Sequence, residues 1–424
     1  MTNLRPQVKK ELDNLIRIAR DYRDGDISES LFLDVILRYK NENENIDSYR
    51  DYLLNNNVKI ILGDDDVEAE NYDNDETLSI KPYDTRLIDI SPKPLSLDMI
   101  IARLENDEID LMPDFQRKSG LWTDEQKSQL IESLILRIPL PAFYFDGSDN
   151  DMWIVIDGLQ RLTALKEFFV DKTLKLVGLE FLKDLEDLTI DDMPRAYVRR
   201  MKETQIITYI INPGAPINLK YNIFKRINTG GLKLEPQEIR HALYQGFATE
   251  YLKKLAQLEV FKQATGYSVK SDRMMDREFV LRFIAFYELS VDDYKGSIDF
   301  FLNSAMEYIN KCYNQQYADY IERIFEKVLD VSELIFGKFA FRRMPDRDKR
   351  RPISKALFET WTSILATYPD EDLQTLVENK DKIIKRYIDM CSCDKDFIDS
   401  IGSGKVSAVR KRYDKIKSLV EEMI

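Results

Sequence analysis

Four residues that suit phosphate chemistry stand close together in the chain: Asp157, Gly158, Gln160 and Arg161. An aspartate can bind a magnesium ion or orient a water molecule, and an arginine can grip two phosphate oxygens with its forked donors. Gln160 offers both a donor and an acceptor, while a glycine lets the backbone approach a ligand closely. The group predicts a phosphate-binding site, with Asp157 and Arg161 as candidate catalytic residues and Asp157 as a candidate magnesium ligand.

The elements around this group are a strand and a helix. Residues 152–157, MWIVID, form an apolar, β-branched run that predicts a buried strand. Gly158 breaks the run, and Leu162, Leu165 and Phe168 then recur at helical spacing. A helix that starts directly after a strand turns its free amides and the positive end of its dipole toward an anion. A second interpretation stays open, in which Asp157 and Arg161 only pair with each other and cap the helix.

A second glutamine–arginine pair, Gln116 and Arg117, lies in the stretch PDFQRKSGLW at residues 113–122. Thr123 and Gln126 then form a capping-box pattern, which predicts a helix as far as about residue 136. Both glutamine–arginine pairs therefore stand at the beginning of a helix. We predict that the two pairs converge on one ligand.

The loop RINTGG is a third candidate for phosphate binding, through Asn228, Thr229 and Gly230. Two glycines beside an asparagine can turn backbone amides toward an anion, and Arg226 and Arg240 could face the same ligand. The alternative is a simple turn between two helices.

Composition and charge limit the function classes. The chain has 424 residues, of which 44% are hydrophobic, and this is enough to bury a core in two or three domains. The formal net charge of -13 excludes a protein that coats DNA through overall positive charge. Eight carboxylates stand in residues 64–76, and the rest of the chain carries only about -5 without them.

Two basic stretches stand out against this acidic background, at residues 341–355 and 409–417. Either can contact nucleic-acid phosphates, although a solvated charged surface is an equally good interpretation. The candidate DNA-contacting residues are Arg342, Arg343, Arg350, Arg351, Arg410, Lys411 and Arg412.

Hydrophobic patterning divides the chain into four segments. Residues 1–63 predict a small helical module, and residues 64–81 an acidic linker. Residues 82–250 alternate short strands with helices and contain all of the phosphate-site candidates. Residues 251–424 show long helical periodicity with few strand candidates. The predicted fold class is therefore α+β, with a mixed α/β core followed by a mostly helical C-terminal domain.

Three cysteines give no disulfide framework, and no run of about 18 apolar residues or export signal is present. These features predict a cytoplasmic protein without a membrane partner.

Several motifs occur in a characteristic order: PDFQR, LIESLILRIPLP, VIDGLQRLTAL, FKRINTGG and EIRHALYQG. In this order they resemble the N-terminal domain family of GmrSD-type restriction endonucleases, also known as domain of unknown function 262. The resemblance covers roughly residues 82–424, including the stretch RRPISKALFE. It implies a core similar to the ParB and sulfiredoxin fold. It also implies roles for Asp157, Gly158, Gln160 and Arg161, which match the family's DGQQR motif except that Leu159 replaces the first glutamine.

The resemblance further implies binding of a nucleoside triphosphate with Mg²⁺, with or without hydrolysis, the base being unknown. Members commonly serve the restriction of foreign or modified DNA, so the expected partners are a nucleotide, DNA and a partner nuclease or other anti-phage defence protein. The alternative is a regulatory module that binds nucleotide or DNA without turnover. A single histidine, His241, argues against the HNH nuclease to which family members are often joined.

Overall fold

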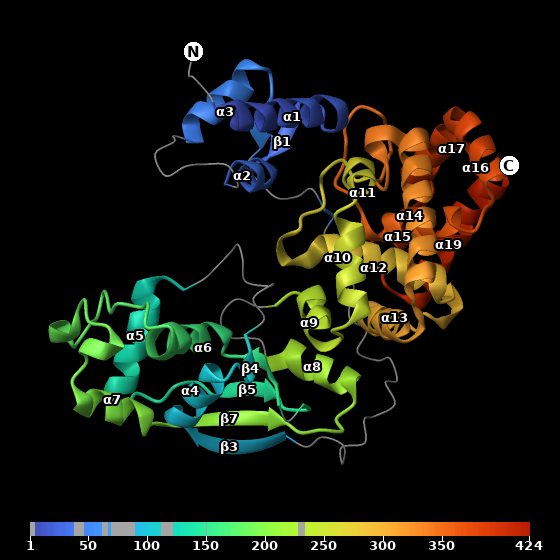
Figure 1. Cartoon of the computed structure of the whole chain (residues 1–424). Coiled ribbons are helices and arrows are strands. Elements are labelled where there is room, and N and C mark those ends of the chain that lie inside the picture. Colours follow the sequence, from blue (N-terminus) through green and yellow to red (C-terminus); the bar gives the residue numbers. More distant parts are fainter. Residues whose placement is uncertain are drawn as a thin grey trace. The chain divides into compact units, whose positions relative to one another are not determined.

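The computed structural model describes residues 5–37, 46–61, 67–68, 90–111, 122–149, 151–227 and 234–424. The chain forms two compact units (Figure 1): Ser79–Leu243 is unit 2, and Met1–Leu78 together with Tyr244–Ile424 is unit 1. The predicted α+β class with a helical C-terminal region is confirmed. Within the described ranges, no helix is long and apolar enough to cross a membrane.

Unit 2 is built on a five-stranded mixed sheet with the order β3-β7-β5-β6-β4. The β3–β7 and β5–β6 pairs are antiparallel, whereas β5–β7 and β4–β6 are parallel. The strands are β3 (Ile90–Ser96), β4 (Ile109–Asp110), β5 (Phe143–Asp146), β6 (Trp153–Asp157) and β7 (Gln205–Ile211). The predicted strand at residues 152–157 is confirmed as β6.

Helices cover both faces of this sheet. Strand alternation sends Phe143 and Phe145 into the larger core, beside Leu162 of α6, and Tyr144 toward a smaller core that contains Tyr221 and Phe224 of α8. The helices of unit 2 are α4 (Leu97–Glu105), α5 (Asp124–Ile135), α6 (Leu159–Leu165) with its π-helical continuation Lys166–Val170, α7 (Arg195–Lys202), α8 (Ile217–Ile227) and α9 (Pro236–Leu243). Two 3-10 turns, Lys183–Leu185 and Ile190–Asp192, complete it.

Helix α5 begins at the predicted capping box, in which Thr123 and Gln126 each bond the other's backbone. Its buried Glu132 accepts three backbone hydrogen bonds from the loop after α6, from the amides of Glu180 (2.9 Å), Phe181 (2.7 Å) and Leu182 (2.8 Å). Burial opposes the charged form of Glu132, but the three donors outweigh it, and the pKa of this carboxyl is lowered. Glu132 thus fixes a loop that has no regular structure of its own.

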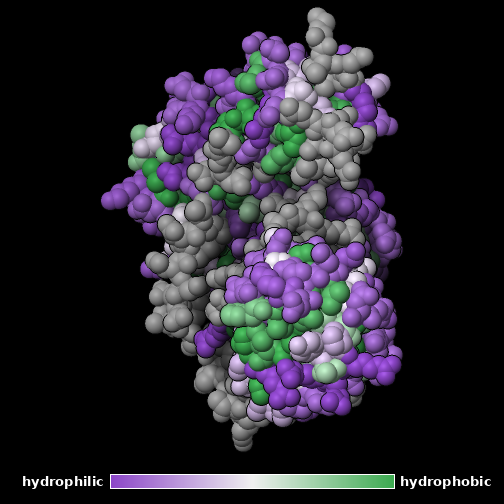
Figure 2. All heavy atoms as spheres, turned by 90° about the vertical axis from the view of Figure 1, so that its left-hand side faces the viewer, coloured by the Kyte–Doolittle hydropathy of each residue, from purple (hydrophilic) through white to green (hydrophobic). Residues whose placement is uncertain are grey.

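One face of unit 2 displays apolar side chains within a hydrophilic rim (Figure 2). The exposed large apolar residues of this unit include Leu136 and Ile138 after α5 and Phe181 in the loop that Glu132 holds.

Unit 1 contains both the N-terminal and the C-terminal part of the chain. Its N-terminal module contains α1 (Pro6–Tyr22), α2 (Glu29–Leu37) and α3 (Ile46–Asn55), with a parallel pair of short strands, β1 (Asp26–Ser28) and β2 (Lys59–Ile61). Buried Arg23 of this module donates to the backbone carbonyl of Tyr267 at 3.1 Å, in the C-terminal part of the unit. The sequence-predicted N-terminal and C-terminal segments therefore share one compact unit.

The rest of unit 1 is helical, as Figure 1 shows in yellow to red. Its helices are α10 (Phe247–Ala256), α11 (Glu259–Ala264), α12 (Met275–Glu288), α13 (Ile298–Cys312), α14 (Gln315–Phe336), α15 (Lys355–Leu365), α16 (Asp370–Glu378), α17 (Lys380–Cys393), α18 (Lys395–Ile401) and α19 (Val406–Glu421), with 3-10 turns at Asp272–Met274, Val291–Asp293 and Gly337–Phe339.

Candidate functional site

The strand that carries Asp157 ends in a β-bulge. Along the β5–β6 pair, Phe145 lies opposite Val155, but Tyr144 lies opposite Asp157, so the register shifts by one residue between them. A bulge places an extra residue in one strand and re-aims the side chains next to it, and such bulges are frequent beside functional sites. The bulge therefore decides where Asp157 points at the end of the sheet.

Gly158 makes the turn from β6 to α6 possible. Its φ is +101°, in the left-handed region, and a Cβ at this position would lie 2.5 Å from Cδ1 of Phe143. Gly158 is also the N-cap of α6 and forms no side-chain cap, and the first turn contains no acidic residue. Because the first amides of a helix have no acceptors within the helix, this N-terminus offers uncapped donors to an anion.

The guanidinium of Arg161 forms hydrogen bonds to other residues of the chain. Its Nη2 donates to Oδ2 of Asp157 at 2.9 Å and to the backbone carbonyl of Ala142 at 3.2 Å. Its Nη1 donates to the carbonyl of Pro141, and the guanidinium lies over the ring of Phe143 at 4.4 Å. Arg161 therefore fixes the segment that leads into β5, and the interpretation of an internal Asp157–Arg161 pair agrees with this geometry.

Burial governs the electrostatics of this pair. It raises the pKa of Asp157 even though Arg161 and the Gly158 amide pull it down, and it lowers the pKa of Arg161 even though Asp157 favours the cation. Burial therefore disfavours the charged form of both residues, and each charged side chain stabilises the charge of the other. Removing one partner would leave a partly buried charge uncompensated.

Gln160 connects two of the sequence motifs. Its Oε1 accepts a hydrogen bond from the backbone amide of Trp122 at 3.2 Å. Trp122 ends the stretch at residues 113–122 and directly precedes the capping box of α5. The starts of α5 and α6 are thereby held together.

Two tyrosines beside this turn were missed by the sequence analysis. The rings of Tyr144 and Tyr209 stack with centroids 4.9 Å apart and an interplanar angle of 12°, and both residues are half-buried. Burial raises the pKa of Tyr144, with Tyr209 and Asp157 adding to the shift. The available signal was the alternation in FYFD, which turns Tyr144 away from Phe143 and Phe145. An aromatic platform of this kind can stack a nucleobase.

Several predicted residues lie outside the residues that the structure describes. These are Gln116, Arg117, Asn228, Thr229 and Gly230. Of the two arginines near the RINTGG loop, Arg226 is exposed near the end of α8. Arg240 is buried in α9, where its guanidinium lies over Tyr221 at 5.5 Å and donates to Gln237 at 3.2 Å.

A magnesium site would draw little from the described part of the chain. There, no group of three or more His, Cys, Asp or Glu residues is placed to hold a metal ion. Asp157 offers one carboxylate, of which one oxygen already accepts from Arg161. Mg²⁺ is commonly held by one or two carboxylates together with substrate phosphates. The geometry therefore fits magnesium only as a companion of a bound phosphate.

The prediction that Arg342 and Arg412 contact DNA is wrong for this structure, because both side chains are fully buried. Arg342 donates to the carbonyls of Ala340 and Thr265, each at 2.8 Å. Arg412 donates from Nη2 to Oε1 of Glu359 at 2.8 Å.

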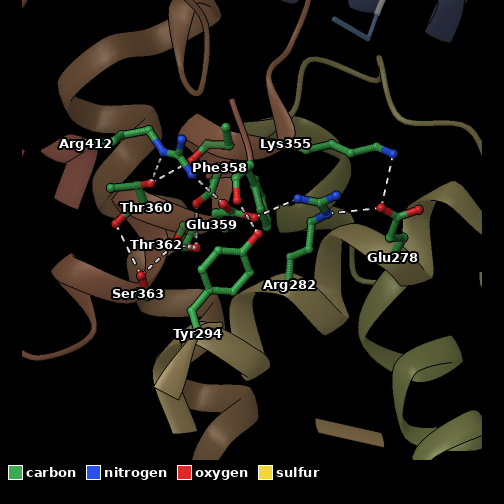
Figure 3. Close-up of polar contacts among 12 residues, drawn as sticks. Glu278, Arg282, Tyr294, Lys355, Phe358, Glu359, Thr360, Thr362, Ser363 and Arg412 are labelled. Carbon is green, nitrogen blue, oxygen red and sulfur yellow. Dashed lines mark hydrogen bonds and ion pairs between the residues drawn. The ribbon is translucent and has the colours of Figure 1, made fainter. Parts of the chain in front are cut away.

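Glu359 is the centre of a buried network in unit 1 (Figure 3). Its second oxygen, Oε2, accepts from Arg282 at 2.7 Å, and Arg282 also pairs with Glu278 at 3.0 Å. Lys355 pairs with the same Oε1 of Glu278 at 3.1 Å. The network ties α12, α15 and α19 together, so Arg412 serves the core of the helical region.

The remaining candidate DNA-contacting residues lie nearer the surface, and each has a partner within the chain. The contacts are Arg343–Glu68 (3.2 Å), Arg351–Asp346 (3.7 Å), Arg410–Asp292 (3.2 Å), Lys411–Asp396 (2.9 Å) and Arg350 with Oγ of Ser268 (2.9 Å). The four ion pairs in this set contribute only about 0–1 kcal/mol each.

Comparison with known protein families identifies one segment of the chain. Residues 100–245 match the sequence model of a family described as the N-terminal domain of the GmrSD restriction endonuclease. The matched segment covers β4 to β7 and α5 to α9, and it therefore includes the turn at Gly158. No curated protein and no solved structure gave a match.

Proposed function

We propose that this chain is a component of a DNA restriction system whose unit 2 binds a nucleoside triphosphate, because residues 100–245 match the family model of the GmrSD N-terminal domain. The observation that carries the proposal is the uncapped N-terminus of α6, which follows the bulged end of β6 through Gly158. Phosphate oxygens would accept hydrogen bonds from the first backbone amides of α6 and from the side-chain nitrogen Nε2 of Gln160.

Other residues of unit 2 would complete the binding site. Asp157 would hold a magnesium ion through the carboxylate oxygen that does not accept from Arg161, with the phosphates supplying further ligands. The Tyr144–Tyr209 stack would provide a surface for the base. Gln116 and Arg117, and the loop residues Asn228, Thr229 and Gly230, are the further phosphate-binding candidates that the sequence supplies. Arg161 would act as a positioning residue that holds Asp157 and the start of β5.

The sharpest test is to place a negative charge at the proposed anion site without weakening the helix. In Gln160→Glu, the new carboxylate stabilises the start of α6 by about 0.3–1 kcal/mol through the helix dipole, but it repels a bound phosphate. Gln129→Glu makes the same charge change on the exposed surface of α5 and is the matched control. Isothermal titration would compare a panel of nucleoside triphosphates, each with and without Mg²⁺.

We expect wild type and Gln129→Glu to bind one or more triphosphates, and Gln160→Glu to bind at least about tenfold more weakly, equivalent to about 1.4 kcal/mol. Equal affinity in all three proteins would contradict the proposed site, and the lack of any nucleotide binding would contradict the proposed function.

A second function is favoured by the engagement of Asp157 with Arg161, since a carboxylate held in an internal pair is poorly placed to activate a water. In that function, unit 2 is a regulatory module that binds nucleotide without hydrolysing it. A phosphate-release assay with and without DNA separates the two functions. Release that exceeds the rate without protein supports hydrolysis, whereas tight binding without release supports the regulatory module.

A further inference from the structure

A cluster of tyrosines surrounds one carboxylate in the helical part of unit 1. The carboxylate is Glu288, and the helices that contribute are α10, α12, α13 and α14 (Figure 1). We call the group the tyrosine cluster; its members are Glu288, Tyr251, Tyr308, Tyr313, Tyr317 and Tyr320. None of these residues belongs to the GmrSD-family segment or to the proposed nucleotide site.

Glu288 stands at an electrostatically unfavourable position. It is the last residue of α12, where the helix dipole favours a cation. Two neutral hydroxyls donate to the Glu288 carboxylate instead. The hydroxyl of Tyr313 lies 2.8 Å from Oε1, and that of Tyr317 lies 3.0 Å from Oε1 and 3.2 Å from Oε2. Among the residues described by the structure, no lysine or arginine forms an ion pair with Glu288. The carboxylate is thus solvated by donors, but its charge is not neutralised.

The surroundings of the cluster are acidic as well. Burial raises the pKa of Tyr251, and Glu322, Asp319 and Glu288 add to the shift. Burial and Glu288 likewise raise the pKa of Tyr317. Glu322 is paired with Lys254. Asp319 accepts a neutral hydrogen bond from Gln315 at 2.7 Å, and it forms no ion pair with any residue that the structure describes. The cluster therefore has a local excess of negative charge.

The tyrosine rings of the cluster pack against one another and are partly accessible to solvent. Tyr313 and Tyr317 meet edge to face with centroids 5.0 Å apart, and the ring of Tyr320 follows at 5.9 Å from Tyr317. Tyr320 is 46% exposed, and Tyr308, Tyr317 and Glu288 are partly exposed. The faces of aromatic rings are electronegative and attract cations. Here the ring faces and the carboxylate offer a cation two kinds of attraction at once.

We propose that the tyrosine cluster binds an arginine side chain of a partner protein. A guanidinium can stack on a tyrosine ring and donate to the outer lone pairs of Glu288 at the same time, which a compact ammonium does less well. The alternative ligand, single-stranded nucleic acid, would stack its bases on the same rings but bring its phosphates beside Glu288 and Asp319, and like charges repel. The charge of the site therefore favours a basic protein segment.

The test uses the full chain and a peptide in which arginine alternates with glycine. A second peptide carries citrulline in place of arginine, which has the same shape without the charge. Isothermal titration at moderate salt would compare wild type with Glu288→Gln and with Tyr320→Ala, whose side chain is 46% exposed. Because the whole chain is acidic, Glu371→Gln on the exposed surface of α16 is the matched control for a general charge effect.

We expect the arginine peptide to bind wild type and Glu371→Gln alike, and to bind Glu288→Gln and Tyr320→Ala about tenfold more weakly. The citrulline peptide should not bind. The proposal is overturned if the arginine peptide fails to bind wild type, or if all four proteins bind it equally. Binding of a thymidine oligonucleotide that is lost in Tyr320→Ala would also overturn it, in favour of nucleic acid.

Discussion

Replacement of Gly158 by alanine tests how the β6–α6 turn is built, because two separate costs can be calculated for it. Alanine at φ +101° costs about 1–2 kcal/mol, as its Cβ approaches the backbone too closely. The same Cβ would lie 2.5 Å from Cδ1 of fully buried Phe143, whose ring also supports Arg161 at 4.4 Å. Forcing that ring to move adds about 1–3 kcal/mol, which is typical of overpacking.

The matched control is Gly214→Ala in the same unit. Gly214 has a φ of +95°, but nothing lies within 4 Å of a Cβ built there, so only the backbone cost applies. Both substitutions reduce the entropy of the unfolded chain equally, and this term cancels in the comparison. We therefore expect Gly158→Ala to lower the free energy of unfolding by about 2–5 kcal/mol, and Gly214→Ala by about 1–2 kcal/mol.

Tryptophan fluorescence can follow unit 2 alone. The chain has three tryptophans; Trp122 and Trp153 lie in unit 2 and Trp361 lies in unit 1. In a Trp361→Phe background, urea unfolding monitored by fluorescence reports unit 2. If Gly158→Ala costs no more than Gly214→Ala, the close contact with Phe143 does not constrain the turn, and the reasoning about this glycine is refuted.

Two further substitutions probe buried charges. Glu132→Gln should cost about 1–3 kcal/mol at neutral pH, because an amide cannot accept all three backbone hydrogen bonds. The pKa of Glu132 is lowered in the folded state, so its stabilisation is present above the unfolded pKa of about 4.3 and is lost on acidification through the folded pKa. Urea titrations should therefore show the two proteins converging below about pH 4, and a constant difference would contradict this. Glu359→Gln should destabilise unit 1 by about 3–5 kcal/mol by leaving two buried guanidiniums without their carboxylate. Glu371→Gln, which removes one of three acidic residues from the first turn of α16, should cost no more than about 1 kcal/mol. Thermal melts would compare the two variants, and equal losses in both would argue against the network.

Local sequence patterns were sufficient to predict the elements that position the candidate site. The apolar run before Gly158 became β6, the helical spacing after it became α6, and the capping box at Thr123 begins α5. These features depend on neighbouring residues, so they can be recognised without knowledge of the fold. The contacts of Arg161 with residues 141–143 depend on the β5–β6 pairing, and nothing in the local pattern specifies them.

The burial of Arg412 could have been recognised from periodicity. Val409, Arg412, Tyr413 and Ile416 follow one another at helical spacing, and all four are buried in α19. Arg412 thus occupies a core position, although the stretch VRKRYDKIK looks basic when only its composition is considered. Glu359 in KALFETW and Arg282 in FVLRFIAF likewise interrupt apolar helical runs. A charge at a core position of one helix indicates an opposite charge on another helix, but the sequence does not say which helix.

The internal pairing of Arg161 changes where the positive charge for a triphosphate must come from. With Asp157 and Arg161 neutralising each other, the described residues at the turn offer the uncapped amides of α6, which amount to about half an elementary charge, and the neutral amide of Gln160. A triphosphate carries several negative charges, so this is insufficient. The balance would have to come from Mg²⁺ and from arginines outside the turn, of which Arg117 is the strongest candidate because its motif leads directly to Trp122, the residue bonded to Gln160.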